Sequence, residues 1–341
     1  MKKLSLLCLL LTVASLGYGQ QPFRFSQYFQ NLVTVNPAVA GIEDFTDLKV
    51  GYRQQWTGLE GSPQTFYLSA HAPLASKPRA FTFQNNALRI SDPNAFDQLE
   101  TQTTISTGNR VRHGIGGYIV NDRQGIFQQT QAFATYAAHL PLGARTRLSL
   151  GVSAGINNRR IDPDGIRLPG QDTDDDVLNQ LLSQSSGTTS LDLNLGLMLY
   201  AENYYLGYSA DRILRNPVVV GTDSADVRQN VYHYGLLGGR FRLGSSFMLL
   251  PGAFVGVSEV LPLTYDLNLR LRYQEVVWIG ASYRNSGTVA GMLGLNIDNR
   301  FNINYAYDYG VGTVSDFRSG THEIVLGFTL FKQQDSAPYL W

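Results

Sequence analysis

The feature that most constrains the fold is a strict alternation of apolar and polar residues, repeated in segments of about ten residues. In 264–274, apolar residues such as Leu269 alternate with polar residues such as Arg270, and the same alternation recurs in 190–200 and 301–310. A period of two residues places alternate side chains on opposite faces of a β-strand, whereas a helix repeats every 3.6 residues. The chain is therefore predicted to be all-β.

The number and length of these segments predict a transmembrane antiparallel up-and-down β-barrel of about fourteen strands, because bacterial single-chain outer-membrane barrels have an even number of strands. The expected strands are 47–56, 63–74, 113–121, 130–142, 146–160, 190–200, 204–213, 231–243, 246–258, 264–274, 276–285, 288–297, 301–310 and 320–331. A water-soluble sandwich shows the same alternation, but its strands are usually shorter, at roughly 5–6 residues.

The lengths of the connections support the same architecture. Short turns are expected at Leu142–Arg145, Ala201–Asn203, Leu243–Ser245, Gln274–Glu275 and Ile297–Arg300. Longer connections alternate with them at 161–189, 214–230 and 311–319. Outer-membrane barrels have short periplasmic turns and longer outer loops, so both chain ends are predicted to lie in the periplasm. The long connection 75–112 is an exception on the periplasmic side.

The start of the chain predicts export. Lys2 and Lys3 precede an apolar run that ends at Leu16, and Gly19 follows as a small residue at the expected cleavage position. This is typical of a cleaved secretory signal peptide, and the run is shorter than the roughly 20 residues of a membrane helix. The expected organisation is a signal peptide at 1–19, an N-terminal periplasmic or lumenal segment at 20–46, a β-barrel at 47–331 and a tail at 332–341. The one cysteine, Cys8, lies in the signal.

The balance of charge excludes one class of partner. The chain has 27 basic and 27 acidic residues and a formal net charge of zero. Nucleic-acid binding needs a basic surface that replaces the counterions of the phosphates, so no nucleic-acid partner is expected. The lipid bilayer is the expected surroundings of the barrel.

The N-terminal segment combines aromatic, amide and turn residues in a way that neither a strand nor a flexible leader would. A barrel with many more than eight strands leaves its lumen unfilled by wall side chains, so we expect this segment to be a plug in the lumen or a docking surface at the periplasmic mouth. A disordered leader would be poorer in aromatic residues. The candidate plug or partner-docking residues are Phe25, Tyr28, Phe29, Asn36, Pro37 and Gly41.

Charged residues fall on the face of the strands opposite the leucines and are predicted to line the lumen. The arginines on this face could form the lining of a conducting pore, or could pair with the acids Asp266, Asp192 and Glu323. Lumen charges in barrels are usually balanced, which favours pairing. The candidate lumen-lining residues are Arg240, Arg242, Asp266, Arg270 and Arg272.

No motif for catalysis or metal binding meets its structural requirement. Ser153 lies in GVSAG, but it falls within a predicted strand rather than on the sharp turn that a nucleophile elbow needs. The five histidines are scattered among different strands, as they would also be in a barrel phospholipase. Asp172–Asp176 resembles a calcium loop, but Val177 stands where that loop needs glycine. We therefore expect a protein that is not an enzyme and has no cofactor.

Several stretches, in order along the chain, resemble the PorP/SprF family of the type IX secretion system. They include FSQYFQNLVTVNPAVAG, GYRQQWTGLEGSPQTFYLSAHAPL, GIGGYIVNDRQGIFQQTQAFATYAAHLPL, LGVSAGINNRRID, YYLGYSA and GTHEIVLGF. The extended 75–112 connection and the tail after Phe331 depart from the family pattern.

The resemblance implies an outer-membrane barrel of a Gram-negative bacterium that takes part in protein secretion or gliding motility. It also implies partners, namely type IX secretion components in the periplasm or outer membrane and a secreted cargo or the C-terminal domain of a large cell-surface adhesin. Two functions remain open from the sequence. One is a non-enzymatic component that binds cargo and helps to export or anchor it, and the other is a pore for small solutes.

Overall fold

The computed structural model describes residues 24–74, 111–143, 146–162, 187–214, 219–220, 229–259, 262–274, 276–297, 300–311 and 320–331. The predicted signal peptide, most of the 75–112 connection, Asp172–Asp176 and the tail 332–341 lie outside these residues. No helix in the described part of the chain could cross a bilayer.

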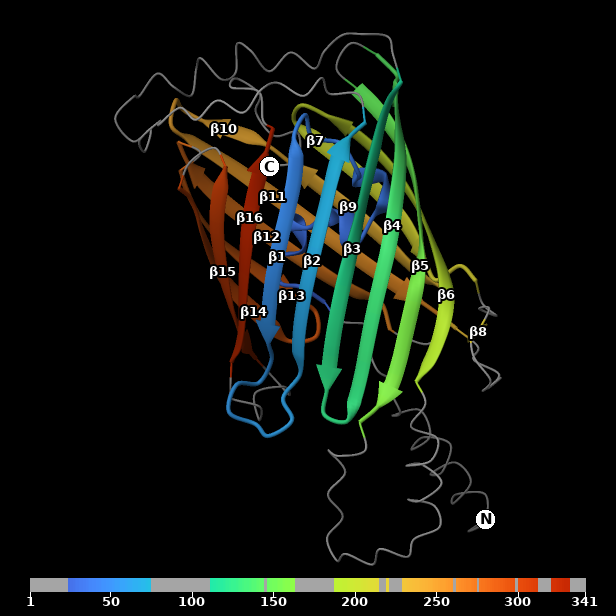
Figure 1. Ribbon diagram of the computed structural model, residues 1–341. Coiled ribbons are helices and arrows are strands. Elements are labelled where there is room, and N and C mark those ends of the chain that lie inside the picture. Colours follow the sequence, from blue (N-terminus) through green and yellow to red (C-terminus); the bar gives the residue numbers. More distant parts are fainter. Residues whose placement is uncertain are drawn as a thin grey trace, which may run out of the picture.

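The described residues form one antiparallel sheet that closes into a barrel, in which the last strand pairs with the first (Figure 1). The strands are β1 (Thr46–Gln54), β2 (Gln64–Pro73), β3 (Arg112–Gln124), β4 (Phe127–Pro141), β5 (Thr146–Ile161), β6 (Thr188–Ala201), β7 (Tyr204–Asp211), β8 (Val219–Val220), β9 (Tyr232–Gly239), β10 (Phe241–Leu243), β11 (Phe247–Ser258), β12 (Thr264–Tyr273), β13 (Val277–Arg284), β14 (Thr288–Asn296), β15 (Phe301–Gly310) and β16 (Thr321–Leu330). Because β8 only adds to one end of β6 and β10 continues β9, the ring has fourteen strands. The predicted barrel is confirmed.

The two ends of the barrel differ. At the end where β1 begins and β16 ends, called here the terminal end and uppermost in Figure 1, several connections are short turns such as 202–203 and 244–246. The long connection between β2 and β3 is an exception at this end. At the opposite end, called here the loop end, β5 and β6 are separated by 162–187. Short turns are typical of the periplasmic side of such barrels, so the terminal end is the one that the sequence predicts to be periplasmic.

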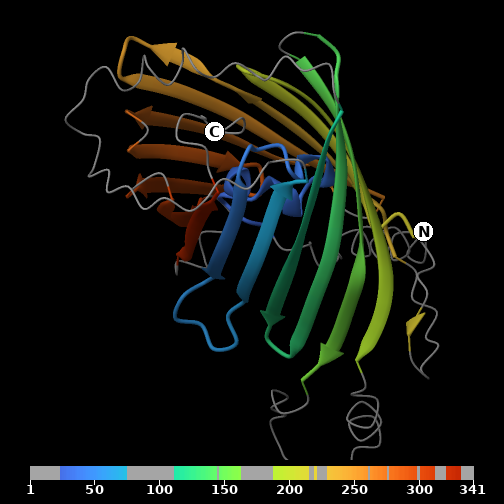
Figure 2. The same cartoon turned by 45° about the horizontal axis from the view of Figure 1, so that its top comes forward.

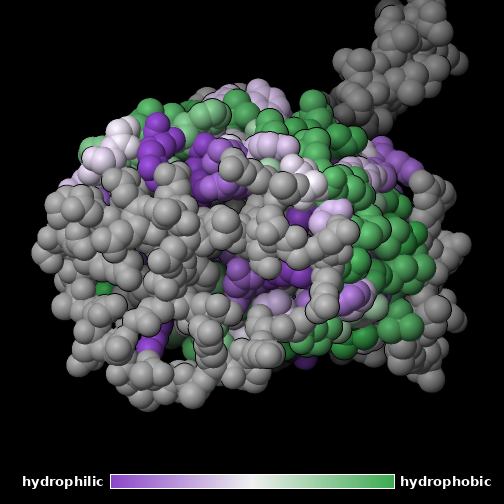
Figure 3. Space-filling model, turned by 90° about the horizontal axis from the view of Figure 1, so that it is seen from above, coloured by the Kyte–Doolittle hydropathy of each residue, from purple (hydrophilic) through white to green (hydrophobic). Residues whose placement is uncertain are grey.

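As expected from the alternation, apolar side chains lie on the outer face of the strands and polar side chains on the inner face. On β12, Leu267 and Leu269 are 51% and 50% exposed, whereas Asn268 and Arg270 are 5% and 4% exposed. A sheet closed on itself hides one face from its surroundings and shows the other to lipid. Seen from above in Figure 3, hydrophilic residues gather towards the middle of the barrel and hydrophobic residues over its side.

One predicted strand differs from the structure. The segment 231–243 is divided at Arg240 into β9 and β10. The neighbouring strand β7 begins at Tyr204, which pairs with Gly239, so β10 pairs with β11 and no longer with β7. Arg240 N donates to the Asn203 carbonyl at 2.9 Å at this break. The sequence pattern carries no sign of the break because it reports the faces of a strand and not the length of its neighbour.

Candidate functional site

The N-terminal segment (residues 24–45) lies inside the ring of strands, where it is drawn in blue in Figures 1 and 2. It forms three 3-10 turns, η1 (Tyr28–Gln30), η2 (Leu32–Thr34) and η3 (Pro37–Val39). Asn36 caps η3 because its side-chain oxygen accepts from Ala38 N at 2.9 Å, and Pro37 occupies the first position, where no N–H is needed. Turns this short satisfy much of their own backbone and can therefore fold without pairing to the barrel wall.

The six candidate residues of this segment all point into packed surroundings. Tyr28, Phe29 and Asn36 are 4%, 6% and 0% exposed, and Phe25, Pro37 and Gly41 are buried as well. Gly41 has a φ of 69°, a left-handed conformation that glycine adopts without strain, and it lies against the backbone of Gly114. The structure thus places these residues in the lumen, against the inward face of the strands.

The beginning of the segment is bound to the seam, where β1 and β16 close the barrel. Glu323 of β16 accepts hydrogen bonds from Ser26 N at 2.8 Å and Gln27 N at 3.0 Å. Arg53 of β1 pairs with Glu323 at 2.9 Å and with Asp308 of β15 at 2.8 Å, and it also donates to Ser26 Oγ at 2.8 Å. These five residues, called here the seam cluster, are at most 4% exposed.

The middle of the segment is bound to the opposite wall. The Asn36 amide donates to the carbonyls of Leu197 at 3.1 Å and Tyr208 at 3.2 Å, on the adjacent strands β6 and β7. Ser149 Oγ donates to the Ala38 carbonyl at 2.6 Å, and Ser209 Oγ to the Val35 carbonyl at 2.7 Å. A buried carbonyl needs such a donor, so the wall satisfies backbone groups that the short turns leave free.

Glycines in the wall make room for this contact. A Cβ built on Gly151 of β5 would overlap the backbone of Pro37 and Ala38, and one on Gly196 of β6 would overlap Asn36 Oδ1 and approach Ala38 N. Any larger residue at either position would push the segment away from the wall. The close fit at these two positions therefore requires glycine.

Aromatic side chains complete the packing. Tyr28 lies 5.2 Å from the Phe254 ring, and Tyr28 Oη accepts from Asn268 at 2.6 Å. Phe29 packs edge-on against Trp278 at 5.7 Å and beneath the Arg270 guanidinium at 3.9 Å. Such a cation–π contact gains strength where water is excluded.

Three of the five predicted lumen-lining residues lie in the lumen, and the other two lie at the terminal end of the barrel. Asp266, Arg270 and Arg272 are 2%, 4% and 7% exposed and lie on the inward face of β12. Arg240 is half-buried with its guanidinium 3.9 Å from Glu202, and Arg242 is exposed on β10. The latter two follow the break after β9, which takes them to the terminal end.

The residues that pair with the lumen acids were missed in the sequence. Glu323 is paired with Arg53, and Asp266 with Arg284 at 3.2 Å. Arg53 and Arg284 both lie on the inward face of their strands, so the alternation was a signal that could have drawn attention to them. The choice of partner depends on which strands are neighbours, and the pattern within one strand does not supply that.

Ser153 and the two histidines that contact the N-terminal segment lie within strands, as the sequence predicted. Ser153 is within β5, and its Oγ is 2.6 Å from Thr135 Oγ1 on β4. Two of the histidines contact the N-terminal segment, His139 through the Ala40 carbonyl at 2.9 Å and His71 through Gly41 N at 3.3 Å. No group of three metal-ligating side chains occurs among the described residues.

Comparison with known proteins gives the family. The solved structures to which the chain is similar include the following three. The Acinetobacter baumannii outer membrane protein Omp33 is 12% identical, with a TM-score of 0.40 over 85% of this chain and 100% of that one. The Ralstonia pickettii toluene transporter TbuX is 10% identical, with a TM-score of 0.45 over 87% and 92%. A Pseudomonas aeruginosa FadL homologue is 11% identical, with a TM-score of 0.44 over 86% and 91%.

No curated protein matches the chain. The family described as type IX secretion system membrane protein PorP/SprF matches residues 17–328, nearly the whole sequence. Together with the closed barrel this match establishes the setting of the protein as the outer membrane. The chain belongs to the PorP/SprF family of type IX secretion system membrane proteins.

Proposed function

We propose that this barrel is a non-enzymatic component of type IX secretion that binds a cargo protein, such as a large surface adhesin, and helps to export or anchor it at the cell surface. The assignment to type IX secretion rests on membership of the PorP/SprF family. The observation that carries the proposal is the N-terminal segment, which fills part of the lumen and is hydrogen-bonded to the wall on both sides. A barrel built in this way serves better as an anchor than as a channel.

The contacts of the segment argue against free passage of solutes. It is bound to the seam through Glu323 and to the opposite wall through Leu197 and Tyr208. These two walls face each other across the ring, so the segment bridges the lumen. A solute pore would require the segment to leave, which would expose the buried acids of the seam cluster and the polar groups that the segment satisfies.

We place the partner-binding surface at the terminal end. The segment leaves the lumen there at 43–45 and continues into β1, and Asp44 forms an ion pair with Arg112 at 2.7 Å. The 75–112 connection joins β2 and β3 at the same end. Because Tyr28, Phe29 and Asn36 are buried, they support this surface from inside by holding the segment in position rather than by touching a partner directly.

Measurement of electrical conductance distinguishes the proposed anchor function from a solute-pore function. The full-length protein reconstituted in a planar bilayer should show little steady current. Deleting residues 21–42 should leave a heat-modifiable barrel with a sharply higher conductance, because a fourteen-stranded ring without an occupant leaves its lumen open. A steady large conductance of the full-length protein would instead support the solute pore.

Cargo display tests the role in secretion. Cells without this protein should fail to display a surface protein or to secrete a set of cargo proteins, while uptake of small solutes stays normal. Alanine at Tyr28, Phe29 and Asn36 together should abolish co-purification of the partner and leave the barrel folded. The matched control replaces the outward-facing Ile279 and Leu293 by alanine. Normal display and a retained partner in the triple variant would contradict the proposal.

A further inference from the structure

Besides bridging the lumen, the N-terminal segment runs along the barrel from one end towards the other. At its last residues, Asp44 forms an ion pair with Arg112 at 2.7 Å, and Arg112 is the first residue of β3 at the terminal end. The Ala40 carbonyl lies 2.9 Å from Nε2 of His139, which is close to the end of β4 on the same side of the barrel. The later part of the segment therefore lies at the terminal end.

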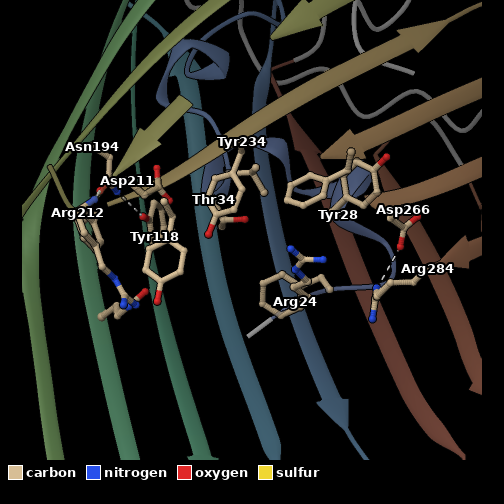
Figure 4. Close-up of a pocket in the computed structure, with 16 residues that line it drawn as sticks. Arg24, Tyr28, Thr34, Tyr118, Asn194, Asp211, Arg212, Tyr234, Asp266 and Arg284 are labelled. Carbon is tan, nitrogen blue, oxygen red and sulfur yellow. Dashed lines mark hydrogen bonds and ion pairs between the residues drawn. The ribbon is translucent and has the colours of Figure 1, made fainter. Parts of the chain in front are cut away.

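The beginning of the segment lies towards the loop end. Ser26 N donates to Glu323, the third residue of β16, and β16 begins at the loop end. Arg24 donates one Nη to Thr264 Oγ1, and Thr264 is the first residue of β12 at the loop end. In Figure 4, where the blue strand β1 runs downwards to its arrowhead, Arg24 lies below Tyr28. Because β1 runs from the terminal end to the loop end, this view agrees with the contacts.

A cavity that is partly open to solvent lies against this beginning of the segment. Its lining includes Arg24 and Phe25 of the segment, and also Asp211, Tyr232 and Arg284 of the wall. These three wall residues are the last of β7, the first of β9 and the last of β13, which are all strand ends at the loop end. The segment thus begins beside open space on the side of the loop end.

The chain before Arg24 is too short to return to the terminal end. The predicted signal cleavage after Gly19 leaves only the four residues 20–23 before Arg24. An extended chain advances at most about 3.6 Å per residue, so four residues reach about 14 Å. The apolar band of an outer-membrane barrel is about 25 Å tall. The way back is also occupied by buried side chains of the segment, such as Phe29 and Leu32.

We propose that the mature chain begins at the loop end, with residues 20–23 accessible there, so that the N-terminal segment reaches both mouths of the barrel. This differs from the expectation that both chain ends lie in the periplasm, which rested on the lengths of the connections. A protein displayed at the loop end and a partner at the terminal end would then contact the same segment. In this respect the proposal adds to the proposed function, but the position of the chain start does not depend on it.

The test is the labelling of single cysteines in intact cells. The one native cysteine, Cys8, lies in the predicted signal, so Gln21→Cys gives a mature chain with a single thiol. The reagent is a polyethylene-glycol maleimide too large to pass the porins of the outer membrane. Two exposed positions serve as controls, Thr57→Cys between β1 and β2 at the loop end and Ser245→Cys between β10 and β11 at the terminal end.

We expect Gln21→Cys to be labelled in intact cells to the same extent as Thr57→Cys, whereas Ser245→Cys reacts only after the outer membrane is permeabilised. Labelling of Gln21→Cys only after permeabilisation would overturn the proposal, because the chain would then begin at the terminal end. Labelling only after the barrel is unfolded would also overturn it, because the chain start would then be enclosed in the lumen.

Two further measurements keep the result clear. Heat-modifiable migration shows whether Gln21→Cys folds, as expected for a position that precedes the contacts of Arg24. Mass spectrometry of the mature protein should find Gln21, and its absence would contradict the cleavage on which the proposal rests. None of these outcomes alters the conductance or the cargo display expected above, so the two proposals fail independently.

Discussion

At the scale of single residues, the seam cluster shows how charges are kept inside this barrel. One arginine, Arg53, faces two carboxylates, those of Asp308 and Glu323. Glu323 also accepts hydrogen bonds from the N–H groups of Ser26 and Gln27, and Ser26 Oγ donates to Asp308 Oδ2 at 2.6 Å. Buried charges persist only where paired and hydrogen-bonded, and here the N-terminal segment supplies part of that pairing.

Replacing Arg53 by methionine should therefore destabilise the protein strongly. The change leaves two buried carboxylates without their cation, and breaking a buried pair in this way costs about 3–5 kcal/mol. Unfolding in urea, followed by the loss of heat-modifiable migration, measures the effect. The control is Arg123→Met, which breaks the pair with Asp162 whose arginine side chain is 55% exposed, where a loss of about 1 kcal/mol or less is expected. Equal losses in the two variants would contradict this account of the seam cluster.

At the scale of the element, each strand carries two environments on its two faces. On β12 the exposed leucines lie against lipid, and the alternate residues contact the N-terminal segment, as Arg270 contacts Phe29. The two faces cannot be exchanged, because a shift of one residue in register would move the whole set of leucines into the lumen.

An arginine on the lipid face of β12 should impair assembly. Leu269→Arg places a charge near the middle of the strand, where it costs about 2–4 kcal/mol. Arg270→Leu removes the inward charge and its contact with Phe29, and it should assemble better than Leu269→Arg. The heat-modifiable fraction after refolding into lipid vesicles compares the two. Leu269→Arg assembling as well as Arg270→Leu would show that the assigned faces are wrong.

At the scale of the whole molecule, the wall and the N-terminal segment fit one another. Gly151 and Gly196 leave no room for a Cβ beside Pro37 and Ala38, and the Asn36 amide reaches two neighbouring strands. Interiors are packed closely enough that one added methyl group is felt. The position of the segment is therefore a property of the assembled barrel and not of the segment alone.

Valine at both Gly151 and Gly196 should expel the segment from the wall and raise the conductance of the reconstituted protein. The barrel itself should persist, since both positions face inward and the space becomes free once the segment leaves. Gly291→Val is the matched control, because no atom lies near a Cβ at that glycine. In the variant that lacks 21–42 the two valines should change the conductance no further, and a further change would mean that they act on the strands directly.

Much of the fold could be predicted because its signal is local. The fourteen expected segments each overlap a strand, and the inward position of Asp266, Arg270 and Arg272 follows from the alternation within β12. The break after Gly239 and the pairing of Glu323 with Arg53 could not be predicted in this way. The break depends on where a neighbouring strand begins, and the ion pair depends on which strands are neighbours. The sequence of a single strand contains neither piece of information.

The sequence by itself determined the strands and their two faces, because alternation with a period of two acts between residues that are adjacent in the chain. It also indicated a compact N-terminal segment through its aromatic and amide residues. Only the tertiary structure decided what that segment touches. Ser26 meets Glu323 across 297 positions of sequence, and Asn36 meets Tyr208 across 172. Such contacts form only when the ring closes in one register, because closure fixes the stagger of all strands together.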